Sequence, residues 1–466
     1  MIQVILAGGL TGILFGFVLQ RGRFCMTSGF RDLFLTRDAT LFKAYVLALA
    51  IQSTGIFVLQ AAGIIRLGAD PFQWLAAAVG GLIFGISLIL SGGCASGTYY
   101  RIGEGMVGSL IAAVFFGIGA LASRGSGILA PLAQRIQAHT LTVNGATSLH
   151  EALGVSPWVL VAGLWVAAIL FLVRARRAPA PAWQPPVDES RPWLWRAVFG
   201  RGWSWQVTGL AVGLVAVLAW LTSVSTGRMG GLGITGATAG LLRLVVASGD
   251  VSALDWSAFL VLGIPVGSFI AARAAGEFRL RAPGPARLLQ HIAGGLGWAS
   301  APRWPGAATS ATGWWPSPSS RSTAGPPPCS SSWARGWAPT CSWCCPPAGR
   351  RAGRWRPPAW RTATEGGGCV MVAELHLDVL GEACPYPLIM AKQKINEVAP
   401  GGRLIIDFDC TQATETLPRW ATESGHAVEE FRKTGPAQWR IVIRKQGDGS
   451  ERVTPDDYTC SVPGQR

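Results

Sequence analysis

The residue best suited to chemistry in this sequence is Cys384, which lies between a predicted strand and a predicted helix. Pro385 and Pro387 follow it in the first turn of that helix, where a missing backbone N–H costs little. Free amides and the positive end of the helix dipole favour a thiolate at this position. We therefore expect Cys384 to be an exposed nucleophile. The alternative is a small apolar side chain packed in a core.

Two further cysteines, Cys25 and Cys94, lie in glycine-rich segments that follow long apolar stretches. Gly92 and Gly93 directly precede Cys94, and glycines permit tight turns and close backbone approach. Helix ends at membrane depth present free amides to an anion. A thiol is a weak, soft donor and acceptor, which suits a sulfur-bearing substrate. The alternative interpretation is that both cysteines are merely small buried residues.

The segment Leu377–Pro387 resembles the TusA/SirA sulfur-carrier family, whose signature is Cys-Pro-x-Pro after an Asp and a Gly. The resemblance covers residues 371–446 and implies that Cys384 carries sulfur as a persulfide, as a sulfur carrier or sulfurtransferase. Cys410 and Cys460 have no such motif. Cys410 ends a predicted strand and is expected to be a packing residue.

The two segments around Cys25 and Cys94, and Thr226–Thr235 in the second half, resemble the YeeE/YedE family of membrane proteins, including its thiosulfate-uptake members. The resemblance runs over residues 1–297. It implies that Cys25 and Cys94 bind thiosulfate and hand it inward through S–H···S contacts. A third pathway cysteine of that family would fall near Ala307, and this chain does not encode it.

The composition agrees with a membrane location for these cysteines. Of 466 residues only 14% are charged, 60 are glycine, and the mean hydropathy is +0.34. Soluble domains carry about 25% charged residues, so a purely soluble enzyme and a disordered regulator are excluded. The net charge of +15 could indicate nucleic acid binding, but the surplus Arg is concentrated in residues 298–365, so we expect no nucleic acid partner.

The apolar segments predict a polytopic α-helical membrane protein. A spanning helix needs roughly 20 apolar residues. Because 232–247 is shorter, we interpret it as re-entrant, which is tolerated where protein buries it. The predicted spanning helices are 3–20, 41–65, 72–90, 106–122, 156–173, 205–222 and 256–275.

Arginine in the loops predicts the orientation and a repeat. The loops after the first and fifth helices are Arg-rich and are expected to be cytoplasmic, with the N-terminus outside. Five crossings then separate the first helices of the two halves, which is typical of inverted repeats in transporters. The expected order is a first repeat at 1–174, a cytoplasmic linker at 175–203, and a truncated second repeat at 204–297.

Residues 298–370 are expected to be an aberrant segment. Residues 298–365 hold nine Trp, eight Arg and four Cys, with no hydrophobic period. One interpretation is a low-complexity linker. The other is a displaced reading frame, because a codon beginning with T, as for Trp and Cys, becomes an apolar codon when shifted by one base. A shifted frame restores a string at 304–313 that parallels the one around Cys94.

Residues 371–446 predict a small α/β two-layer sandwich, cytoplasmic in this orientation. We expect strands at 373–380, 402–409, 427–433 and 438–445, with helices at 386–398 and 412–424, then a disordered tail at 447–466.

Other acidic and histidine residues are weaker candidates for a functional site. Glu104, Asp32 and Asp38 are expected to be solvated loop charges. His139 and His150 lack metal-ligand spacing, so neither a metal nor another cofactor is expected.

These features together predict inner-membrane thiosulfate uptake through a cysteine-lined pathway, coupled to a sulfur carrier. The expected partners are thiosulfate or a related anion, membrane lipid, and cytoplasmic sulfur-transfer proteins. The alternatives are transport of a selenium compound or another sulfur oxyanion, and a membrane-anchored sulfurtransferase.

Overall fold

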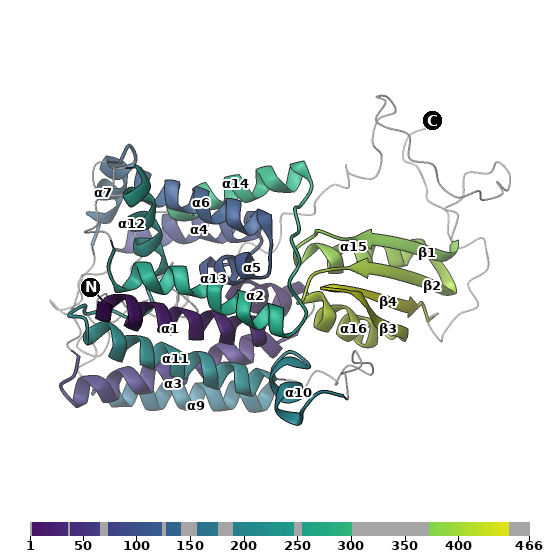
Figure 1. The fold of residues 1–466 in the computed structure, drawn as a ribbon, viewed down its shortest axis with the longest axis horizontal. Helices are drawn as coiled ribbons and strands as arrows, with labels where there is room; N and C mark the ends of the chain where they lie inside the picture. The colour runs from purple at the N-terminus through teal and green to yellow at the C-terminus, as the bar shows by residue number, and fades with distance from the viewer. Residues whose placement is uncertain are drawn as a thin grey trace. The chain divides into compact units, whose positions relative to one another are not determined.

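The computed structural model describes the membrane helices and the C-terminal α/β domain, which belong to one compact unit (Figure 1). The described residues are 2–35, 38–65, 73–123, 127–140, 156–175, 190–246, 254–300 and 372–446. The predicted aberrant segment, apart from its first residues, and the predicted tail lie outside them.

Within these described ranges, six helical segments are long and apolar enough to cross a membrane. They agree with the predicted spans, except that α6 (Val107–Ala122) is shorter. The helix bounds are α1 Ile2–Arg21, α2 Met26–Leu35, α3 Thr40–Ala61, α4 Trp74–Leu90, α5 Ala95–Gly103, α7 Ala130–Gln137, α9 Pro157–Arg174, α10 Trp193–Phe199, α11 Trp205–Val224, α12 Ile234–Val246, α13 Trp256–Ala274 and α14 Pro285–Ser300. The chain is therefore a multi-pass membrane protein, and the predicted helical fold class is confirmed.

Glycines allow the central helices to approach closely. Gly8, Gly12 and Gly16 form one stripe on α1, and a Cβ at Gly12 would lie 3.0 Å from the Cα of Gly263 on α13. Such small-residue stripes replace the hydrophobic effect as the basis of helix pairing in lipid.

In the second half, glycines on α11 allow the same close packing. A Cβ at Gly209 would lie 2.7 Å from the carbonyl oxygen of Ala44 on α3, and Gly213 faces Ile51 on the same helix. The first helix of each half thus packs against a helix of the other half, α1 on α13 and α11 on α3, as repeated halves would.

Two features of the membrane part were not predicted. Short helices α2 and α5 begin directly after Cys25 and Cys94. Helix α14 packs against α4 and α6, where Trp298 contacts Phe116 with a ring separation of 4.5 Å.

The α/β domain is a four-stranded sheet in the order β1-β2-β4-β3, with two helices packed on it. Its bounds are β1 Val372–Val379, α15 Tyr386–Lys394, a 3₁₀ turn Ile395–Glu397, β2 Val398–Phe408, α16 Ala413–Glu423, β3 Ala427–Gly435 and β4 Gln438–Arg444. All four strands and both helices were predicted within a few residues. Strands β1 and β2 are parallel neighbours, so the loops after Val379 and Phe408 leave the sheet side by side.

Candidate functional site

The membrane part brings Cys25 and Cys94 together. Their sulfur atoms are 3.7 Å apart, and both side chains are buried. Cys94 caps α5 and accepts a hydrogen bond from the Gly97 amide at 3.4 Å. The Oγ of Ser96 is 3.3 Å from the same sulfur. Two thiols predicted separately therefore form one pair at adjoining helix starts.

The glycines before Cys94 position a cation beside this pair. Gly92 has a positive φ of 72°, and its carbonyl oxygen accepts a short hydrogen bond from Arg101. A Cβ at Gly93 would lie 3.0 Å from the Arg101 guanidinium, so any larger residue would require that side chain to shift.

The α/β domain forms a second thiol pair, Cys384 with Cys410. Cys384 follows β1 and Cys410 follows β2, and the parallel register of these strands brings them together. Interaction between the two thiols raises the pKa of Cys384 and lowers that of Cys410. The Ala413 amide donates to the backbone oxygen of Cys410 at 3.0 Å, and Arg101 and Arg281 also lower the pKa of the Cys410 thiol.

The surroundings of Cys384 differ from the prediction in one respect. Pro385 precedes α15 and Pro387 lies in its first turn, as expected. However, Cys384 is only 1% exposed and belongs to the core of the α/β domain, so the expectation of an exposed sulfur was wrong. Cys410, expected to be a packing residue, is buried but also pairs with Cys384. The position of Cys410 at the end of a strand parallel to β1 could have predicted this pairing.

Two arginines link the thiol pairs. Arg101 acts electrostatically on Cys25, Cys384 and Cys410. Arg31 acts on Cys25 and Cys384 and is itself paired with Asp32 at 2.7 Å. Three of the four sulfur atoms are therefore within electrostatic reach of one or both guanidinium groups, an arrangement that favours a bound anion.

Gln412 connects the two parts at this point. Its Oε1 accepts from Arg101 at 2.7 Å, and its Nε2 donates to the backbone oxygen of Arg23 and to the Tyr100 hydroxyl, each at 3.1 Å. Sequence reasoning did not single out Gln412 or Arg101. Both lie within two to seven residues of a predicted cysteine or of Cys410, which is the only sequence signal they carry.

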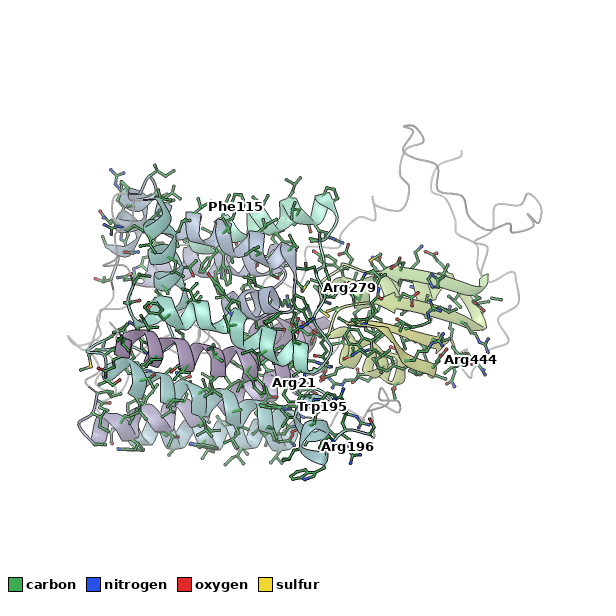
Figure 2. All side chains as sticks on the ribbon, in the orientation of Figure 1. Arg21, Phe115, Trp195, Arg196, Arg279 and Arg444 are labelled. Carbon is green, nitrogen blue, oxygen red and sulfur yellow. The ribbon has the colours of Figure 1, made fainter. Side chains whose placement is uncertain are left out.

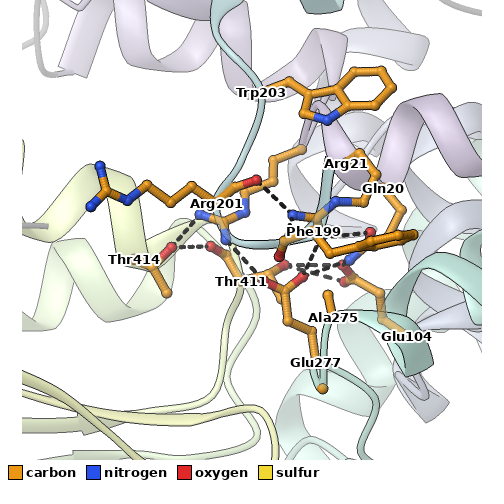
Figure 3. A network of polar contacts seen from close by, with 12 residues as sticks. Gln20, Arg21, Glu104, Phe199, Arg201, Trp203, Ala275, Glu277, Thr411 and Thr414 are labelled. Carbon is orange, nitrogen blue, oxygen red and sulfur yellow. Dashed lines mark hydrogen bonds and ion pairs between the residues drawn. The ribbon is translucent and has the colours of Figure 1, made fainter. Parts of the chain in front are cut away.

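A buried polar network lies beside the thiols (Figure 3). Gln20 donates to Glu104 at 3.2 Å and to Glu277 at 2.8 Å, and the Thr411 hydroxyl donates to Glu104 at 3.1 Å. Burial raises the pKa of Glu104 to about 7. Burial alone would also raise the pKa of Glu277, but Arg23 and Arg21 hold it below its usual value.

Ion pairs hold the α/β domain against the membrane helices. Arg419 pairs with Asp38, and Arg23 bonds Glu415 at 3.0 Å. Figure 2 shows Arg21, the last residue of α1, and Arg279, in the connection between α13 and α14, on the side of the membrane helices that faces this domain.

Helix α14 contacts the Cys384 loop directly. Its Arg287 lies 3.4 Å from Glu382 and 3.4 Å from the centre of the Tyr386 ring.

The expectation that Glu104, Asp32 and Asp38 are solvated was wrong, because each is at most 6% exposed. Distant segments supply partners for two of them, Thr411 for Glu104 and Arg419 for Asp38, whereas Asp32 pairs with the adjacent Arg31. His139 contacts the Trp74 ring, and His150 lies outside the described residues. Among the described residues no group of three or more His, Cys, Asp or Glu could hold a metal ion.

Comparisons with known proteins identify both parts. A family model described as "Sulphur transport" matches residues 21–301, and one described as "Sulfurtransferase TusA" matches residues 376–445.

Relatives of each part are known in other organisms. The membrane part is similar to the thiosulfate transporter TsuA of Escherichia coli, at 42% identity over 64% of this chain and 82% of the relative, and to TsuA of Spirochaeta thermophila, at 34% identity over 63% of this chain and 85% of the relative. The C-terminal part is 49% identical to the E. coli protein named as the sulfur carrier protein TsuB, over 15% of this chain and 92% of that protein. The chain therefore belongs to the sulphur transport family, with a TusA-like domain following in the same polypeptide.

Proposed function

We propose that this protein takes thiosulfate up across the inner membrane and passes its sulfur to Cys384 on the cytoplasmic side. The observation that carries the proposal is that Arg101 bonds both Gly92, two residues before Cys94, and Gln412, two residues after Cys410, and so links the segments of the two pairs. The two relatives named as thiosulfate transporters and the one named as a sulfur carrier support it.

The membrane pair suits loose binding of a sulfur anion. Cys25 and Cys94 offer weak S–H contacts to the terminal sulfur of thiosulfate, and the helix starts beside them add amide donors. Weak contacts allow release, and Arg101 attracts the dianion onward.

The carrier pair suits covalent chemistry. Cys384 attacks the outer sulfur of thiosulfate, the S–S bond of thiosulfate breaks, and sulfite leaves with the bonding electron pair. The product is a persulfide on Cys384.

The orientation proposal rests on arginines. Arg174, Arg191, Arg196 and Arg201 follow the fifth apolar segment, and positive loops stay cytoplasmic. Glu415 of the α/β domain pairs with Arg23 in the first such loop, so this domain is proposed to be cytoplasmic as well.

Uptake of labelled thiosulfate by cells that lack other sulfur-uptake systems tests transport. Cys25→Ala and Cys94→Ala are expected to abolish uptake, whereas Gly85→Ala, whose added Cβ meets nothing within 4 Å, is expected to leave it unchanged. Unchanged uptake in both cysteine variants would refute the pathway. Unlabelled selenium compounds and other sulfur oxyanions serve as competitors, and stronger competition by one of them than by thiosulfate would reassign the substrate.

Persulfidation of Cys384 separates transport from a membrane-anchored sulfurtransferase. In vesicles with external thiosulfate, mass spectrometry is expected to find the persulfide only when Cys25 and Cys94 are intact. Persulfide formation in the Cys25→Ala variant would favour the sulfurtransferase.

We also propose the domain boundaries predicted from the sequence, including a displaced reading frame in residues 298–370. Sequencing the DNA between codons 295 and 371 tests it, and an intact frame would refute the displacement.

A further inference from the structure

Cys410 has no role in the function proposed above, yet it is the nearest described nucleophile to Cys384. Val379 and Phe408 are partners in the β1–β2 ladder, and the two cysteines follow these residues. Cys410 is 5% exposed and packs in the same buried core cluster as Cys384.

The surroundings of Cys410 fit a thiolate. The Ala413 amide at the start of α16 donates to the backbone oxygen of Cys410 at 3.0 Å, and Arg101 and Arg281 are nearby cations that lower the pKa of its thiol. The adjoining loop is held in place, because Asp409 accepts from the Gly381 amide at 3.0 Å and lies 3.9 Å from Arg281. The positions of the two sulfurs are thus fixed from both strands.

We propose that Cys410 is the resolving thiol of the carrier domain, which attacks the Cys384 persulfide and releases its outer sulfur as hydrosulfide. This inference rests on the proposed persulfide at Cys384. It makes the domain a thiosulfate-cleaving centre that releases sulfide, rather than only a carrier that waits for a separate acceptor.

The steps balance without an external oxidant. In the first, the Cys410 thiolate accepts the Cys384 proton while Cys384 attacks the outer sulfur of thiosulfate and sulfite departs. In the second, the Cys410 sulfur attacks the inner sulfur of the persulfide and forms the Cys384–Cys410 disulfide. Hydrosulfide leaves with the electron pair of the persulfide bond and the proton that Cys410 held. The two cysteines are oxidised, the outer sulfur is reduced, and a cytoplasmic dithiol then restores both thiols.

The experiment uses the full chain in detergent, reduced, freed of reductant and then mixed with thiosulfate without oxygen. Sulfite and sulfide are measured, and mass spectrometry maps the state of Cys384 and Cys410. The variants are Cys410→Ser and Cys410→Ala. The matched control is Cys460→Ser, which changes a cysteine without motif support outside the described residues.

The wild-type chain and Cys460→Ser are expected to release sulfite and sulfide in equal amounts and to form the Cys384–Cys410 disulfide. Both Cys410 variants are expected to form sulfite and retain the persulfide on Cys384, with sulfide release reduced about tenfold or more until an external thiol is added.

Three results would overturn the resolving role: wild-type sulfide release from either Cys410 variant, no Cys384–Cys410 disulfide in the wild-type chain, or no persulfide in variants that retain the wild-type elution profile. Absence of both sulfite and persulfide from the wild-type chain would instead refute the proposed function itself.

Discussion

The two thiol pairs of this protein use the same local device in different surroundings. All four cysteines among the described residues are free thiols that precede short or medium helices: Cys25 and Cys94 lie directly before α2 and α5, Cys384 lies two residues before α15, and Cys410 lies three residues before α16. Each therefore lies near free backbone amides.

The difference lies in what fixes each pair. Cys25 and Cys94 come from separate breaks in the membrane helices and meet at 3.7 Å against the bare Cα of Gly97. Cys384 and Cys410 come from adjacent parallel strands, and their surroundings shift the two pKa values in opposite directions. The first arrangement suits a passing anion and the second suits bond making, although the residue type is the same.

The largest effect is expected from filling the space beside the membrane pair. In Gly97→Ala the new Cβ would lie 2.8 Å from the Cys25 sulfur and 3.3 Å from the Cys94 sulfur, so one thiol must move. We expect thiosulfate uptake to be lost and stability to fall by about 1–3 kcal/mol. Gly85→Ala on α4 is the matched control. Wild-type uptake by Gly97→Ala would show that the pair needs no fixed spacing.

A smaller effect is expected from changing the cation between the pairs. Arg101→Lys keeps the charge but cannot hold Gly92 and Gln412 at once. We expect the KM for uptake to rise about tenfold, equivalent to about 1.4 kcal/mol, with little change in maximal rate. Arg403→Lys, on the exposed side of β2, is the control. An unchanged KM would remove Arg101 from the path of the anion.

Glu104 links the membrane part to Thr411 and is expected to make stability pH-dependent. Its pKa is about 7 in the folded protein against an ordinary value of 4.5. The folded state thus binds more protons between these values, so its contribution to stability is greatest below about pH 4.5 and is lost as pH rises to 7. The shift corresponds to about 3 kcal/mol.

Glu104→Gln is expected to flatten this part of the pH dependence in thermal unfolding between pH 5 and about 8. Glu277→Gln is the control of opposite sign, because the pKa of Glu277 is lowered and its carboxylate pairs with two arginines. That variant is expected to lose stability at neutral pH. If the stability of Glu104→Gln changed with pH in the same way as that of the wild type, Glu104 would not be the source of the pH dependence.

The smallest effect concerns the ion pair that joins the two parts. Asp38→Asn removes the charge that pairs with Arg419 and is expected to weaken docking by about 1 kcal/mol. Alkylation of buried Cys384 should then become a few-fold faster, as followed by mass spectrometry. Asp407→Asn breaks the Asp407–Arg440 pair inside the α/β domain and is the control. Equal alkylation rates in the two variants would show that this ion pair between the two parts does not protect Cys384 from alkylation.

Hydrophobic length and alternation predicted most elements, because each element depends on residues close in sequence. They placed α11 at 205–222 against the observed Trp205–Val224 and β4 at 438–445 against Gln438–Arg444. Helix α14 was missed because its apolar residues are interrupted by Arg287, Gln290 and glycines.

The site was predicted less completely for the same reason. Cys25, Cys94 and Cys384 could be found because short motifs surround them. Glu104 could not be recognised as buried, because its partners Gln20 and Thr411 are 84 and 307 residues away. Polar side chains look solvated in a sequence until the segment that covers them is known.

The sequence by itself therefore determined the membrane helices, the α/β domain and three of the four thiols, since local patterns and motifs encode them. Only the tertiary structure decided that the thiols form two pairs, that Arg101 and Gln412 lie between them, and that Cys384 is buried with Cys410 as its partner. These depend on backbone register and on docking between distant segments, which bring together charges and sulfurs that no local pattern relates.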